Sequence, residues 1–178
     1  MLDSFQVRYA TNLNVSDSNV NLTNVGSAGG TDPAGDICAN LYIFSPGQQL
    51  SACCSCPLTP NHLVTLSVQK DVMKNLLTPA LPMSITIAIA ATTEVGGTCN
   101  ASNVQPANLV SGLRAWGTTW HAIKGSGFAE TETAFSPVIL STSELNKMNS
   151  YCGFIQTIAS GYGICGPCQT GASGARKQ

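Results

Sequence analysis

The chain has 178 residues, only 10% of them charged, and a formal net charge of −1. Because its few cations are scattered, it has no basic stripe that could neutralise a phosphate backbone, which argues against a nucleic-acid partner. The longest apolar stretch, residues 83–91, is far shorter than the roughly 20 apolar residues of a membrane-spanning helix. These features predict one globular domain without a membrane span.

The first half of the chain consists of short alternating runs separated by Asn, Gly, Pro and Ser, a pattern typical of β-strands joined by turns. The strands expected here lie at 5–9, 20–24, 37–44, 50–56, 63–68 and 85–89. The clearest hairpin has the connection 45–49, which carries Pro and Gly where a turn needs them. A helical turn is expected over 71–77, where two prolines soon end it.

The second half predicts one more hairpin and the single helix of the chain. Residues 113–123 and 128–135 flank a Gly-containing turn. Ser141 and Glu144 match the capping-box spacing ahead of apolar residues on one helical face, which predicts a helix near 142–151. Seven to nine strands and one short helix indicate an all-β, disulfide-stapled β-sandwich, Ig-like or jelly-roll-like.

The chain divides into an N-terminal strand or arm over 1–12, a β-sandwich domain over 13–168 and a Gly/Ala/Ser-rich tail over 169–178. In the first strand, Phe5, Val7 and Tyr9 share one face. This strand could add to an open sheet edge of a neighbouring subunit, with these three residues as the interface. Pairing within its own domain is an equally good interpretation.

Eight cysteines in a chain with so little charge predict an exported protein with a disulfide framework. Cys53 and Cys54 are neighbours on opposite faces of a strand, so we expect them to bond to different partners. Cys165 and Cys168 could close a small loop. The eight residues expected in disulfides are Cys38, Cys53, Cys54, Cys56, Cys99, Cys152, Cys165 and Cys168. Sequence cannot choose among their 105 possible pairings. The expected location is extracellular or at the cell surface, after removal of a signal peptide.

The motifs that would carry catalysis are weak. The segment 165–168 spells a redox dithiol motif, but no βαβ pattern surrounds it, so a structural bridge is favoured. His62 near the cysteines of 53–56 lacks the paired spacing of a zinc site. His62 and His121 are the only histidines, and no nucleophile elbow is present. Glu130 and Glu132 are more typical of a solvated strand face than of an acid/base pair. We therefore predict no enzyme activity, no metal and no cofactor.

A cluster of larger side chains lies on one face of the strand expected over 113–123. Arg114, Trp116 and Trp120 alternate with smaller residues and so share that face. The two indoles could stack on sugar rings, with Arg114 donating hydrogen bonds to hydroxyls. A buried tryptophan filling the core of a sandwich is the commoner arrangement and is favoured here.

The cysteine-rich block Cys-Cys-Ser-Cys and several other segments resemble uncharacterised secreted proteins of soil acidobacteria. The segments that carry the resemblance are 36–46, 50–60, 96–99, 113–116, 131–133 and 151–155. The resemblance implies export and a disulfide framework and provides no activity or catalytic residue.

Three roles follow from these observations. The first is a structural subunit of an extracellular filament, pilus-like or adhesive, assembled by strand addition between copies of the chain. The alternative is a monomeric module that binds surface glycans through Trp116 and Trp120. A secreted thiol oxidoreductase using Cys165 is the third.

Overall fold

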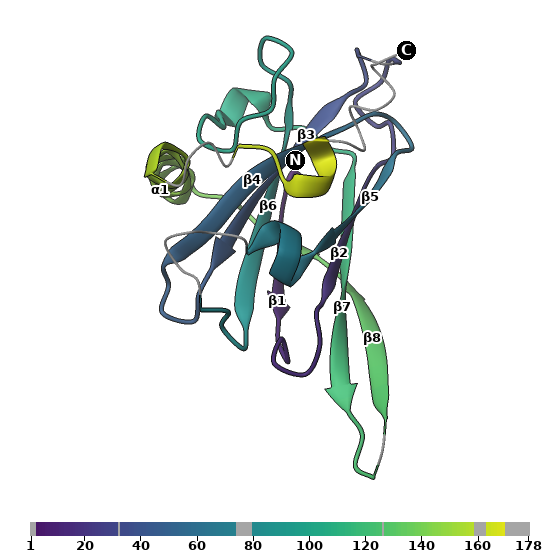
Figure 1. The fold of residues 1–178 in the computed structure, drawn as a ribbon. Coiled ribbons are helices and arrows are strands. Elements are labelled where there is room, and N and C mark those ends of the chain that lie inside the picture. Colours follow the sequence, from purple (N-terminus) through teal and green to yellow (C-terminus); the bar gives the residue numbers. More distant parts are fainter. Residues whose placement is uncertain (1–2, 32, 74–79, 126, 159–162, 170–178) are drawn as a thin grey trace.

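The computed structural model describes residues 3–31, 33–73, 80–125, 127–158 and 163–169. It confirms the predicted β-sandwich: two antiparallel sheets pack together, and one α-helix lies beside them (Figure 1). Sheet A contains, in spatial order, β4 (Leu50–Leu58), β3 (Ile37–Phe44), β6 (Ile85–Thr93), β1 (Phe5–Ala10) and β9 (Ser136–Pro137). Sheet B contains β5 (Leu63–Ser67), β2 (Asn19–Asn24), β7 (Leu113–Ala122) and β8 (Phe128–Ala134).

Sheet A is buried on both faces. Its inner face packs against sheet B through aliphatic side chains such as Ile87 and Leu41, which meet Leu22 of β2. Its outer face is covered in part by the helix α1 (Thr142–Ile158), which contributes Met148 and Ile155 to a second apolar cluster. Burial on both sides explains why β3 reads as a nearly continuous apolar run.

The first strand lies within sheet A, next to the short edge strand β9. The structure pairs β1 with β6 from Phe5↔Ala90 to Ala10↔Ile85, and with the short β9 on its other side. The strand expected as a possible donor is therefore an interior strand of its own sheet. Its β6 side is paired along all six residues, whereas its β9 side is paired only at Gln6 and Val7.

The polar side of β1 faces the interior of the sandwich. Gln6 Nε2 donates to the carbonyl of Leu113 at 2.9 Å. Arg8 is buried and donates from Nη2 to Thr119 Oγ1 at 2.8 Å, so it is held by groups of the opposite sheet. Burial lowers the pKa of Arg8. The hydroxyl and carbonyl acceptors offset part of the cost of burying this cation.

Helix α1 begins where the sequence predicts and ends later. The hydroxyl of Ser141 accepts a hydrogen bond from the amide of Glu144 at 3.1 Å, which is the expected N-cap. The predicted end near Tyr151 is too early, since the helix continues to Ile158. Cys152 and Ile155 extend the buried face by a further turn, and their burial favours the longer helix.

Both predicted hairpins are present. The β7–β8 hairpin extends beyond the rest of the molecule at the bottom of Figure 1. A short π-helix, Val68–Val72, overlaps the start of the helical turn expected over 71–77; residues 74–79 lie outside the described residues, as does the tail beyond Gln169. Within the part of the chain that is described, no helix has the length and apolar character needed to cross a bilayer.

Candidate functional site

The eight cysteines form four bridges, and no cysteine is free. The bridges are Cys38–Cys99, Cys53–Cys152, Cys54–Cys165 and Cys56–Cys168. The neighbours Cys53 and Cys54 bond to different segments, which confirms the expectation from strand geometry.

The suggested bridge between Cys165 and Cys168 is wrong, because both cysteines bond to residues of strand β4. Cys54 and Cys56 share one face of β4, where they meet the short 3-10 helix Gly166–Gln169. Residues just before this helix also run along the edge of β4, with the amide of Ser55 donating to the carbonyl of Gly163 at 2.9 Å. In the folded protein, the motif at 165–168 has no free thiol, and its two disulfides attach this segment to β4.

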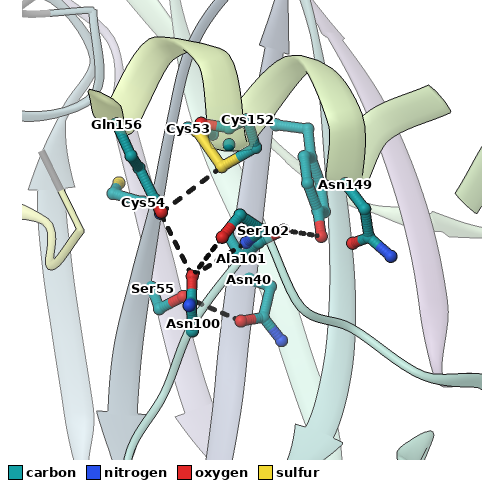
Figure 2. The surroundings of a disulfide bond; sticks show 12 residues. Asn40, Cys53, Cys54, Ser55, Asn100, Ala101, Ser102, Asn149, Cys152 and Gln156 are labelled. Atoms are coloured by element: carbon teal, nitrogen blue, oxygen red, sulfur yellow. Dashed lines mark hydrogen bonds between the residues drawn. A yellow bond between two sulfur atoms is a disulfide. The ribbon is translucent and has the colours of Figure 1, made fainter. Parts of the chain in front are cut away.

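The surroundings of the Cys53–Cys152 bridge are also structural in character. Figure 2 shows α1 above the strands, with Gln156 of the helix reaching down to Asn100. Gln156 Nε2 donates to Asn100 Oδ1 at 3.2 Å, and this oxygen also accepts from the amide of Ser102 at 2.9 Å. These contacts fasten the loop around residue 100 to the helix, and they present no nucleophile or base.

The outward face of sheet B carries the two tryptophans. Alternate residues of β7 point inward: Leu113 and Ala115 are buried in the core, and Thr119 binds the interior Arg8. Trp116 and Trp120 therefore point outward, away from sheet A, and both are half-buried. The sequence favoured indoles inside the core, but here aliphatic residues fill the space between the sheets.

Polar residues of the neighbouring strands flank the two indoles. Asn21 of β2 lies opposite Trp116, and Glu130 of β8 lies opposite Trp120. Glu132 is opposite Thr118, between the two tryptophans. An extended surface of indole rings beside amide and carboxylate groups can offer stacking and hydrogen bonding together.

A third aromatic residue belongs to this surface and was missed at the level of the sequence. Phe128 is 60% exposed and pairs with Ala122, two positions beyond Trp120. Diagonal neighbours of this kind on paired strands lie about 7–8 Å apart. The alternation of Phe128 with Glu130 and Glu132 was the available signal. We call Trp116, Trp120 and Phe128, with Asn21, Glu130 and Glu132, the aromatic face.

The charged groups around the aromatic face differ in whether they have a hydrogen-bond or ion-pair partner. Arg114 Nη1 binds Asp3 Oδ2 at 2.9 Å, so the arginine that was expected to contact sugars already has an ion-pair partner. Burial raises the pKa of Asp3, but the hydrogen bonds from Arg114 and from a backbone amide outweigh it, and the net pKa is lowered. Among the described residues, neither Glu130 nor Glu132 has a hydrogen-bond or ion-pair partner for its carboxylate.

The other predicted interface residues lie on the opposite side of the molecule. Phe5, Val7 and Tyr9 line a groove of about 520 Å³ on the outer face of sheet A beside α1. At its rim, Lys147 Nζ is 2.6 Å from Glu144 Oε2. A role of this groove between subunits stays a prediction.

The described residues contain no group of three His, Cys, Asp or Glu side chains that could hold a metal ion.

No family model and no curated protein matches the sequence. One solved structure is similar, the crystal structure of Thermotoga maritima 1070, with 9% sequence identity and a TM-score of 0.44. The similarity covers 78% of this chain and 97% of that one. A likeness this distant carries no functional argument.

Proposed function

We propose that this protein is an exported glycan-binding module and that the aromatic face is its binding surface. The observation that carries the proposal is the outward position of Trp116 and Trp120 on one strand, flanked by polar side chains. Four disulfides are typical of proteins that fold outside the reducing cytosol, which supports an extracellular location.

The energetics also favour a binding role for the two indoles. A tryptophan can bury about 150–250 Å² of surface, so an indole of intermediate burial still leaves part of its apolar area in water. Two such side chains with Phe128 beyond them form an extended apolar surface, and surfaces of this kind on soluble proteins mark interaction sites. Along β7 the two tryptophans are separated by about 14 Å. This spacing exceeds one sugar ring, which favours an oligosaccharide as the ligand.

Intrinsic fluorescence tests the proposal directly, because Trp116 and Trp120 are the only tryptophans in the chain. We expect oligosaccharides to change the emission of the unreduced protein in a saturable way. Trp120→Ala should weaken binding about tenfold, since it removes a stacking surface worth on the order of 1 kcal/mol or more. Phe154→Ala, which alters an exposed aromatic on α1, is the matched control and should bind normally. Binding that is unaffected by Trp120→Ala, or no response to any glycan, would refute the proposal.

A structural subunit of an extracellular filament is the second candidate, and the free edges of sheet B favour it. Strand β8 is exposed along all seven residues and has a strand partner on one side only within the described structure. The strand β5 forms the opposite edge of the same sheet. Pairing of β8 with β5 of the next copy would continue the sheet from subunit to subunit.

Electron microscopy of the unreduced protein tests this candidate. Deletion of residues 1–10 is unsuitable, because it would remove an interior strand of sheet A. The amides of Phe135 and Ile123 bond across the hairpin, so even-numbered residues of β8 direct their amides to the free edge. Glu132→Pro should therefore block edge pairing while leaving the β7–β8 ladder intact. Filaments lost in this variant would support the second candidate, and single particles in the unaltered protein would exclude it.

A further inference from the structure

Two carboxylates without a hydrogen-bond or ion-pair partner among the described residues lie beside the rings of the aromatic face. Glu130 is directly opposite Trp120 in the β7–β8 ladder, a position in which side chains are in contact range. Glu132 is two residues further along the same face, opposite Thr118. Like charges this close on one strand face repel each other, and no residue in the described part of the chain pairs with either of them.

The cations of the same hairpin do not neutralise this pair. Arg114 is ion-paired with Asp3. Lys124 is exposed in the loop beyond the ends of β7 and β8 and forms no ion pair with another described residue. The surface over Trp120 and Glu130 is therefore locally negative. An anionic glycan would be repelled there, and a neutral glycan would leave both charges uncompensated.

An indole face attracts a cation, because the ring quadrupole places negative charge above the ring plane. A carboxylate beside the ring adds a charge-assisted hydrogen bond to a protonated amine. Trp120 with Glu130 provides both, and Glu132 provides a second acceptor before Trp116 is reached. The group that satisfies this combination is a primary ammonium carried on a ring that can stack.

We propose that the aromatic face selects chains of amino sugars with free, protonated amino groups. The chain lies along β7, its rings stack on Trp116, Trp120 and Phe128, and its amino groups face the carboxylates of β8. This inference rests on the proposed glycan-binding function and names the ligand class of the same surface. It assigns Glu130 and Glu132 to ligand selection.

The experiment compares three hexasaccharides on the unreduced, full-length protein by tryptophan fluorescence and calorimetry. They are a glucosamine hexamer, the N-acetylglucosamine hexamer of the same linkage, and a glucose hexamer. We expect the glucosamine hexamer to bind about five- to tenfold more tightly, as for two exposed ionic contacts. The preference should disappear in Glu130→Gln/Glu132→Gln and at high salt, which screens exposed charges. Glu144→Gln, on α1, is the control and should retain it.

The outcomes separate this inference from the proposal on which it rests. Equal affinity for the three hexamers, weakened in each case by Trp120→Ala, overturns the amine selectivity and leaves the glycan-binding function standing. Glucosamine-hexamer affinity that is unchanged by Trp120→Ala also overturns the inference, since it indicates charge attraction without stacking on Trp120. No binding of any hexamer overturns both.

Discussion

Removal of the Cys54–Cys165 bridge should cost less stability than removal of the Cys53–Cys152 bridge, although it spans the longer segment of chain. The two sequence separations are 111 and 99 residues. An isolated bridge over about 100 residues contributes roughly 4.7 kcal/mol by restricting the unfolded chain. On that basis alone, the two bridges would be nearly equivalent.

The other bridges change this expectation, because they already constrain the unfolded chain. When Cys56–Cys168 is intact, the Cys54–Cys165 bridge closes only a small ring of chain. This ring consists of the residues from Cys54 to Cys56 and those from Cys165 to Cys168. A ring of about 5 residues corresponds to roughly 2 kcal/mol in the loop-entropy estimate.

The Cys53–Cys152 bridge closes a larger ring. Without this bridge, the shortest covalent path from Cys152 to Cys53 follows the chain to Cys165 and crosses the disulfide to Cys54, about 14 residues in all. This ring corresponds to about 3 kcal/mol, so the two removals should differ by about 1 kcal/mol.

Urea unfolding of the unreduced double-alanine variants measures the difference. All four cysteines are fully buried, so the loss of packing is similar in both variants and largely cancels in the comparison. Thiol titration should find no free cysteine in either variant, which controls for rearranged bridges. A loss of stability in Cys54→Ala/Cys165→Ala equal to or larger than in Cys53→Ala/Cys152→Ala would refute the reasoning.

Two further predictions concern Gly117, whose backbone is closely approached by other atoms, and Ser141, whose side chain caps α1. Gly117→Ala should destabilise the protein by about 1–3 kcal/mol, because the new Cβ would lie 2.9 Å from Arg8 and from the carbonyl of Asn19; a thermal midpoint at or above that of the unaltered protein would contradict this. Ser141→Ala should cost about 1 kcal/mol, since it leaves the amide of Glu144 without its cap. Unfolding followed by circular dichroism measures this loss, Ser150→Ala at an exposed position of the same helix is the control, and equal losses in the two would argue against the cap.

The local elements were largely predictable from the sequence. Both hairpins follow from turn residues at 45–49 and 124–127, because turn chemistry acts over a few residues. The start of α1 at Ser141 is likewise a local signal. Its end was missed, because it depends on the burial of Cys152 and Ile155 against sheet A, a long-range contact.

The orientation of β1 could not be read from its alternation. The alternation identified the face that Phe5 and Val7 share, and the structure packs this face beside α1 while Gln6 and Arg8 occupy the space between the sheets. Acceptors more than 100 residues away in the sequence make this burial possible. A strand pattern identifies two faces, and the partners of each face decide which one is inside.

The candidate site shows the same division. The sequence determined that Arg114, Trp116 and Trp120 share a face, because side chains alternate along any strand. The structure decided the register that places Asn21, Glu130 and Phe128 beside them, and it pairs Arg114 with Asp3 while Glu130 and Glu132 have no ion-pair partner among the described residues. The sequence likewise supplied eight oxidisable cysteines, whereas their partners were decided by which segments the folded sandwich brings within bonding distance of β4 and β3.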